Sequence, residues 1–149
     1  MKNFFYTIVI CFIYLVFPLN GISKESNFLN KGIELFKKKE FDKSKIFFEK
    51  NLVFDPKSEK SYLYLAKIFK INSKDDEEEI NLNSVLLLNP KNDEAIYMLT
   101  LLKIKQSDYS EAKNLLSKFV LVCKSFCLKE SEIQEKLNKI IPENVKNNN

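Results

Sequence analysis

The stretch FEKNLVFDPKS, from Phe48 to Ser58, is matched by LNSVLLLNPKN, from Leu82 to Asn92. The two agree in kind at an offset of 34 residues in Phe48 and Leu82, Leu52 and Leu86, Asp55 and Asn89, Pro56 and Pro90, and Lys57 and Lys91. Proline cannot continue a helix, and it disfavours helical backbone in the residue before it. Ser58 or Asn92 then follows, each a good helix N-cap. Both stretches therefore predict a helix end, a turn and a new helix start.

A fixed period of this length indicates stacked helical units. With the two prolines placed near the unit ends, the units span 25–58, 59–92 and 93–126. Each unit should contain two antiparallel helices, since apolar residues recur at helical spacing without a breaker. The expected helices cover 25–38, 41–54, 58–71, 75–88, 92–105 and 108–122. One more amphipathic helix, over 129–141, is expected to cap the array, and 142–149 is expected to be a disordered tail.

The pattern resembles the tetratricopeptide repeat (TPR) family over about 25–126. In unit one the matching positions are Phe28, Gly32, Leu35, Phe48 and Pro56. The resemblance implies an all-α fold, in which about three helical hairpins form a short right-handed solenoid with a C-terminal cap helix. The sequence departs from the family pattern at Lys31, Asn51, Val85, Thr100, Lys103, Phe119 and Lys124. A plain helical bundle with a chance repeat is the alternative.

Composition excludes several kinds of chemistry. The 149 residues include no His, two Gly and three Cys, so no histidine-based nucleophile or zinc site can form. The formal net charge is +4, and its lysines are spread among 20 acidic residues rather than clustered. This favours neither nucleic-acid binding nor a cofactor. The acidic run DDEEE, over 75–79, is interpreted as a helix N-terminus and not as a metal site. We expect no enzyme activity.

The N-terminus has the layout of an export signal. Lys2 precedes an uncharged apolar run over 4–17, which Pro18 ends. Residues 1–23 are expected to be a signal peptide, cleaved after Ser23. The alternative is an uncleaved membrane anchor over about 4–20, although that segment is short for a spanning helix. Either interpretation places the rest of the chain outside the cytoplasm, in the periplasm or on the outer side of the cytoplasmic membrane.

Cys123 and Cys127 are a disulfide candidate. Two close cysteines can pair in an exported protein, but a regular helix is a poor geometry for a bond at this spacing. A helix end at Lys124 would make the bond easier. The alternative is that both are buried as small apolar residues.

The family resemblance implies a non-catalytic module that binds a protein or peptide partner. In that family the first helix of each unit lines a concave groove, and carrying its positions over gives Leu29, Asn30, Ile33, Leu63, Tyr64, Lys67, Tyr97, Met98 and Leu101. Their mostly apolar character implies an exposed apolar stripe and no clamp for a peptide carboxylate. Two alternatives stay open: a self-associating homo-oligomer, and an enzyme or small-ligand binder, which the composition disfavours.

Overall fold

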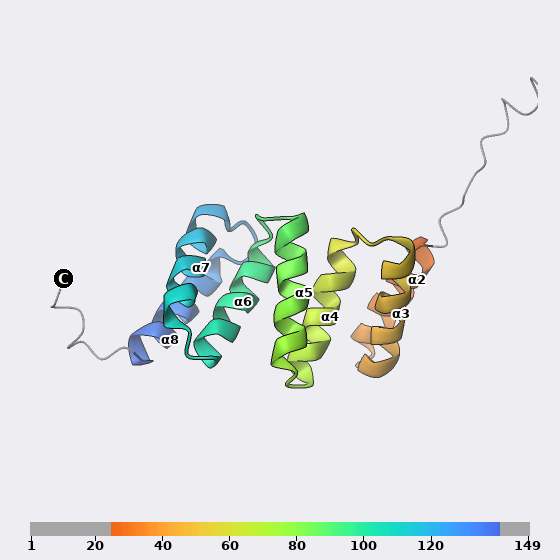
Figure 1. Ribbon diagram of the computed structural model, residues 1–149, viewed down its shortest axis with the longest axis horizontal. Coiled ribbons are helices and arrows are strands. Elements are labelled where there is room, and N and C mark those ends of the chain that lie inside the picture. Colours follow the sequence, from red (N-terminus) through yellow and green to blue (C-terminus); the bar gives the residue numbers. More distant parts are fainter. Residues whose placement is uncertain (1–24, 141–149) are drawn as a thin grey trace, which may run out of the picture.

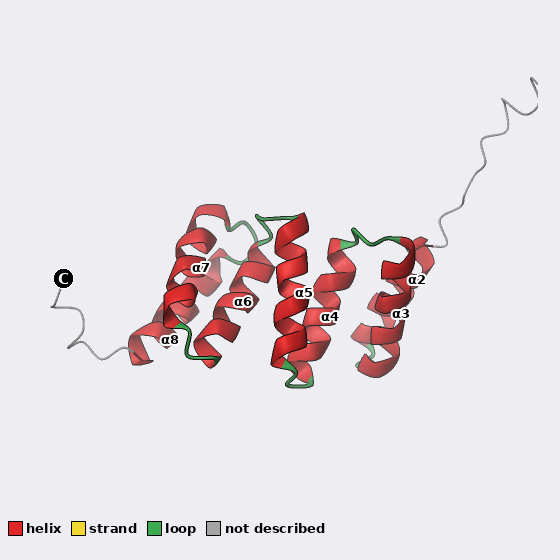
Figure 2. Ribbon diagram, viewed as in Figure 1, coloured by secondary structure: helices red, strands yellow, loops and turns green. Residues whose placement is uncertain are grey.

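The computed structural model describes residues 25–140 as a row of paired helices (Figure 1). The helices are α2 (Glu25–Lys37), α3 (Phe41–Phe54), α4 (Glu59–Ile71), α5 (Asp75–Leu88), α6 (Asp93–Lys105), α7 (Tyr109–Val122), the short 3-10 helix η1 (Cys127–Lys129) and α8 (Glu130–Ile140). Strands are absent from this part of the chain (Figure 2). The expected signal or anchor and the expected tail lie outside the described residues. No helix within residues 25–140 is long and apolar enough to cross a bilayer.

Each predicted unit is a helical hairpin. Helix α2 packs on α3, α4 on α5 and α6 on α7. Successive hairpins meet through α3 against α4 and α5 against α6, and α8 packs on both α6 and α7. The expected all-α array of three hairpins and a cap helix is therefore confirmed. The predicted helix bounds agree with the observed ones to within a residue at the ends that the structure describes.

The turn inside each hairpin repeats with the same 34-residue period. Lys39, Ser73 and Ser107 each adopt a positive φ, of 61°, 55° and 63°. The next residue then donates its backbone N–H to a carbonyl five residues earlier, from Glu40 to Leu35, from Lys74 to Phe69 and from Asp108 to Lys103. This is a usual way to end a helix, although glycine commonly takes the left-handed position. The repeat is thus present in the backbone where the sequence contains no glycine signal.

The two predicted caps between units behave differently. Asn92 caps α6, because its side-chain oxygen accepts from the Ala95 N–H at 2.8 Å. Ser58 also occupies the N-cap position of α4, as predicted, but its side chain makes no cap hydrogen bond. The Ser58 hydroxyl instead lies 3.1 Å from the Ser61 hydroxyl, which accepts from the Asn51 side-chain amide at 3.0 Å. Ser58 is therefore used in a buried polar contact between units one and two.

Phe48 is central to the packing of units one and two. Its side chain is fully buried. A Cβ atom added to Gly32 would lie 2.7 Å from the Phe48 ring, so α2 approaches α3 at the place where it has no side chain. The other face of the seam is Tyr64 of α4, whose ring stacks on Phe48 at a centroid distance of 4.9 Å. Leu65, Ile68 and Phe69 complete this core cluster.

A second and larger core joins units two and three to the cap helix. It contains Leu82 and Val85 of α5, the apolar positions of α6, and Phe119 of α7. From α8, Ile133 and Leu137 enter the same cluster, and both are buried. The apolar side of α8 therefore shields the end of the array, while most of its other side chains are exposed.

Glu78 is a charged residue at a position that the other units fill with a small one. The repeat aligns it with Ser44 and Ala112, both fully buried. Glu78 is itself only 3% exposed. Burial raises its pKa to about 7, although the field of Lys70 opposes the shift and that of Asp75 adds to it. A carboxyl group is thus held in the interior of the second hairpin, where its neutral form is favoured.

Glu78 should make stability fall as pH rises. Its folded pKa is above the unfolded value, so its contribution is complete below the unfolded pKa and is lost as pH rises through about 7. Glu78→Gln should therefore be more stable than wild type by about 3 kcal/mol at about pH 8, and should flatten the dependence above about pH 5. Urea unfolding followed by circular dichroism measures both effects.

Glu79→Gln is the matched control. The hydrogen bond from Lys103 lowers the pKa of Glu79, so this carboxylate stays ionised over the same range and its loss should leave the slope unchanged. An unchanged slope in Glu78→Gln would contradict the assignment.

Candidate interaction site

The nine residues assigned to the binding groove lie on α2, α4 and α6, and they differ in exposure. Asn30 is exposed, and five others are partly buried: Leu29, Ile33, Tyr64, Lys67 and Leu101. The remaining three, Leu63, Tyr97 and Met98, are buried core residues. We call the six accessible residues the first-helix face, since they come from the first helix of each unit. The expected apolar stripe is thus interrupted at three of its positions.

On α2 and α4 the first-helix face is continuous with the core of units one and two. Leu29 and Ile33 pack against that core, as does Tyr64. Besides stacking on Phe48, the Tyr64 ring meets Phe36 edge-on at a centroid distance of 5.0 Å. Aromatic contacts of this kind stabilise beyond the area that they bury. Tyr64 is therefore only partly exposed and supports the fold, so its removal would not report binding alone.

Lys67 connects the first-helix face across two units. Its Nζ lies 4.9 Å from the ring centroid of Tyr64 in the same helix. The same Nζ is 2.8 Å from a carboxylate oxygen of Glu94, at the start of α6. Both side chains of this ion pair are only about one quarter exposed (24% and 25%), so the pair is better shielded from water than a surface one. The one cation assigned to the face is thus already paired with an acid.

In unit three the face is covered by the chain that follows α7. The Tyr97 hydroxyl donates to Glu132 of α8 at 3.0 Å, and its ring lies 5.8 Å from that of Phe126 between centroids. Lys129 Nζ lies 5.7 Å from the ring centroid. Burial raises the pKa of Tyr97, and the hydrogen bond to Glu132 adds to the effect. The expectation that Tyr97 is exposed is therefore wrong, because the returning chain supplies its neighbours.

Met98 and Leu63 are buried for a related reason. Both belong to the core cluster that joins units two and three and that also contains Ile133 of α8. A position on the first helix can face this seam or the open side, and the repeat spacing alone does not distinguish the two. Of the residues assigned to unit three, only Leu101 keeps part of its surface. The accessible part of the face consequently lies mainly on α2 and α4.

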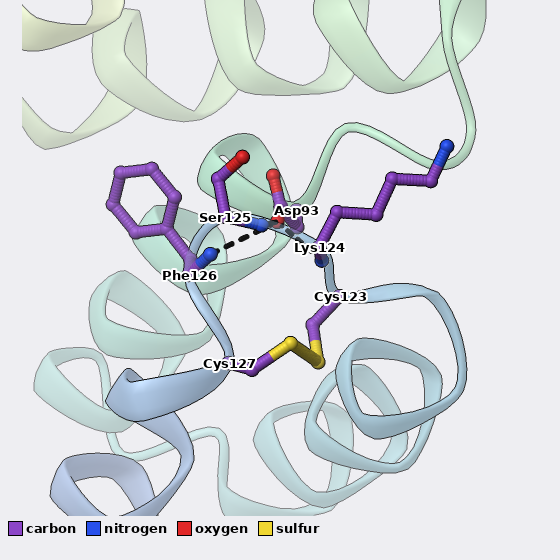
Figure 3. Close-up of a disulfide and its surroundings, with 6 residues drawn as sticks. All are labelled: Asp93, Cys123, Lys124, Ser125, Phe126 and Cys127. Atoms are coloured by element: carbon purple, nitrogen blue, oxygen red, sulfur yellow. Dashed lines mark hydrogen bonds between the residues drawn. A yellow bond between two sulfur atoms is a disulfide. The ribbon is translucent and has the colours of Figure 1, made fainter.

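Asp93 is a structural residue that the sequence analysis missed. One oxygen of its carboxylate accepts the backbone N–H groups of Lys124, Ser125 and Phe126 at 2.7, 2.6 and 3.0 Å (Figure 3). Burial raises the pKa of Asp93, but these hydrogen bonds outweigh it and the net shift is downward. The carboxylate thus fixes the loop that leads from α7 to the cap helix.

The repeat contains a signal for this role. Glu59 stands one period before Asp93, and its carboxylate accepts from the side-chain amides of Asn89 and Asn92, in the loop that ends unit two. An acid at the first position of a unit therefore holds the loop at the end of that unit. Comparing the first positions of the units would have indicated it.

Cys123 and Cys127 are joined by a disulfide in the same loop (Figure 3). Helix α7 ends at Val122, so the bond closes a turn rather than a helical segment. Asp93 and the disulfide thus constrain the same few residues, over 123–127. Together they position η1 and α8 against unit three.

The acidic run at the start of α5 has structural partners. Asp75 pairs with Lys105 at 2.6 Å, Glu79 pairs with Lys103, and Glu78 is buried between helices. Among the described residues, no group of three or more Cys, Asp or Glu side chains is arranged to hold a metal ion.

No protein-family model matches the chain, and no curated protein matches it significantly. Solved structures do match. The TPR domain of Sgt2 from Aspergillus fumigatus has a TM-score of 0.67 and 16% identity, over 79% of this chain and 80% of that one. The first TPR of Spaghetti (RPAP3), solved with the HSP90 peptide SRMEEVD, has a TM-score of 0.70 and 17% identity, over 78% and 93%. A chain of the CopN–Scc3 complex has a TM-score of 0.63 and 16% identity, over 79% and 69%.

These identities are too low to transfer a partner, but the likeness extends over about four fifths of the chain and agrees with the observed hairpins. The protein has the fold of tetratricopeptide repeat domains.

Proposed function

We propose that the chain is a non-catalytic protein interaction module that binds a peptide or protein through the first-helix face of units one and two. The observation that carries this proposal is the accessible surface on α2 and α4: Asn30 is exposed, and Leu29, Ile33, Tyr64 and Lys67 are partly exposed beside it. These side chains combine aliphatic, aromatic and polar groups, as protein-binding surfaces do. Two of the structural neighbours were solved with a bound peptide or in a protein complex.

The chemistry of the face favours an apolar partner over an acidic peptide tail. Leu29 and Ile33 offer no hydrogen-bond donor from their side chains, and Lys67 is already paired with Glu94. A peptide carboxylate would have to displace that acid to bind the lysine. An extended or helical segment with apolar side chains would instead cover Leu29, Ile33 and the exposed edge of Tyr64.

Self-association is the second candidate for this face. A second copy could cover the same side chains, since nothing in a single chain distinguishes the two occupants. Size-exclusion chromatography with light scattering on the full chain separates them. A monomer at micromolar concentration supports a heterologous partner, and a stable dimer supports self-association.

Asn30→Arg combined with Lys67→Glu should weaken partner binding by about tenfold or more, because it places a long charged side chain and a reversed charge on the face. The protein that the full chain captures from an envelope fraction is the probe, and its affinity for wild type and variant is measured. Asn30 is exposed, but Lys67→Glu also breaks the ion pair with Glu94. The helical circular-dichroism signal and the melting point are therefore measured to separate lost binding from lost folding.

The matched control is Asn83→Arg with Lys113→Glu, which makes the same chemical changes at exposed positions on α5 and α7. This variant should bind like wild type. Equal loss in both variants, or in neither, would remove the first-helix face as the site.

We propose further that the protein works outside the cytoplasm, in the periplasm or at the outer side of the membrane. Two observations support this. Lys2 precedes an uncharged apolar run over 4–17, and Cys123 and Cys127 form a disulfide. Disulfides persist in oxidising compartments and are rare in the cytosol.

The cysteine pair provides the test of export. In protein isolated from its native cells under thiol-trapping conditions, Cys123 and Cys127 should resist alkylation until a reductant is added. Intact-mass measurement with and without reductant counts the modified thiols, and a peptide digest assigns them. Alkylation of both thiols without reduction would contradict export.

A further inference from the structure

The fold leaves an apolar side chain exposed at the same place in every unit. Val53, Leu87 and Leu121 are 76%, 84% and 85% exposed, and the 34-residue repeat aligns them in the last turns of α3, α5 and α7. Leu128, in η1, is 93% exposed. Packing among the described residues accounts for none of them, because none belongs to either core cluster. Exposed apolar side chains are candidates for an interaction surface where several of them gather on one side of a protein.

Val53, Leu87 and Leu121 lie along one edge of the array, and Leu128 follows the loop that Asp93 holds there. The two helices of a hairpin are antiparallel, so the second helix of every unit ends on the same side. Figure 1 shows the loops after α3 and α5, together with the end of α7, along the upper edge of the row of helices. Phe54 and Leu88, the next residues after Val53 and Leu87, are also exposed there. We call Val53, Phe54, Leu87, Leu88, Leu121 and Leu128 the apolar edge.

Lysines accompany the apolar edge. Lys57, Lys91 and Lys124 follow the ends of α3, α5 and α7 within a few residues, and all three are exposed. None of them forms a salt bridge with a described side chain. This side of the array thus combines exposed apolar side chains with exposed lysines that form no salt bridge with a described side chain.

Three acidic side chains near this edge accept hydrogen bonds from its loops. The Asp93 carboxylate binds three backbone N–H groups, and Glu59 accepts from two asparagine side chains. Asp55 accepts from the backbone N–H of Lys57. These three acids keep their negative charge, but they are turned into the loops and are partly buried, whereas the three lysines are exposed. The lysines are therefore the ionic groups most accessible to a ligand. Apolar side chains interleaved with lysines fit an anionic lipid surface. The apolar side chains would enter the interfacial region of the bilayer, and the lysine ammonium groups would bind lipid phosphates.

The chain enters the array at this same edge. Helix α2 runs antiparallel to α3, and Phe28 near its start stacks on Phe54 at a centroid distance of 5.5 Å. Only residues 18–24 separate the start of α2, at Glu25, from the apolar run over 4–17. If that run enters a bilayer, so short a connection keeps the apolar edge close to the bilayer surface.

We propose that the apolar edge is a membrane-docking surface that lies against an anionic bilayer, the bilayer that residues 4–17 enter. The inference takes the alternative in which the N-terminal segment stays in the chain, and it does not depend on the partner of the first-helix face. The helices would then stand on end on the membrane. The first-helix face lies on the sides of those helices and would remain open to the partner.

The absence of tryptophan from the chain provides a direct test, since a single introduced tryptophan reports only its own position. Leu87→Trp and Leu121→Trp probe the apolar edge. Ile71→Trp is the control, because Ile71 is 51% exposed at the end of α4, on the opposite edge. Each full chain is reconstituted into phosphatidylcholine vesicles containing phosphatidylglycerol and a lipid brominated along its acyl chain. Quenching of tryptophan emission is measured at constant lipid.

Docking predicts that both edge tryptophans are quenched at least about twofold more strongly than the one at position 71, because only they reach the acyl boundary. Equal quenching at all three positions would overturn the proposal. Folding of each variant is checked by circular dichroism, and all three positions are exposed enough to accept the larger ring.

The charge contribution is tested in the Leu87→Trp background. Lys57→Glu with Lys91→Glu should remove most of the extra quenching, since it reverses two of the cations that face the lipid. Lys39→Glu with Lys113→Glu changes the net charge equally at exposed positions away from the edge, and should leave quenching unchanged. The same loss in both pairs would overturn the assignment of these lysines.

A second copy of the chain is the competing occupant, and the same probe detects it. In neutral detergent without lipid, Leu87→Trp should stay accessible to acrylamide at every protein concentration. Shielding that grows with concentration would show an interface between copies and would overturn the membrane assignment.

Discussion

The ring of Phe48 lies between Gly32 of its own hairpin and Tyr64 of the next, and the stacking of units one and two depends on that position. A helical hairpin cannot bury both of its sides alone, so each unit needs a neighbour. Here one aromatic ring fills the crossing inside a unit and the seam between units. Because the ring is fully buried, close packing leaves it little room to move when either neighbour changes.

The sequence predicts the helices well because proline, the repeat period and apolar spacing all act locally. It predicts side-chain roles less well. Ser58 stands where a cap is expected, but its hydroxyl lies beside Ser61 in the seam between units. Tyr97 stands at a groove position, but the chain beyond α7 folds back over it. In both cases the deciding neighbour belongs to another element, and no periodicity connects the two.

One departure from the family pattern is explained by the structure. Lys103 replaces an aromatic residue or leucine, and its Nζ donates to Glu79 of the preceding unit. A packing contact is thus replaced by an ion pair between hairpins, partly shielded from water. Glu78, next to it in sequence, has no such partner and remains a titratable group in the interior. Two adjacent glutamates consequently have opposite effects on the same hairpin.

The two proposed surfaces lie on different sides of the array. The first-helix face lies along the sides of α2 and α4, whereas the apolar edge lies at the ends of α3, α5 and α7. The braced loop over 123–127 closes the third unit and directs α8 onto it. The two proposed surfaces share no side chain. The 34-residue period recurs in both surfaces, at Ile33, Lys67 and Leu101 of the first-helix face and at Val53, Leu87 and Leu121 of the apolar edge.

The close approach of α2 to Phe48 can be measured most directly with Gly32→Ala. Alanine favours a helix by about 1 kcal/mol over glycine, whereas overpacking a filled core costs about 1–3 kcal/mol. The account predicts that the free energy of unfolding falls in Gly32→Ala, and that Phe48→Leu costs less in this background than in wild type, because the smaller side chain relieves the clash. A rise in stability in Gly32→Ala, with additive effects in the double variant, would contradict it.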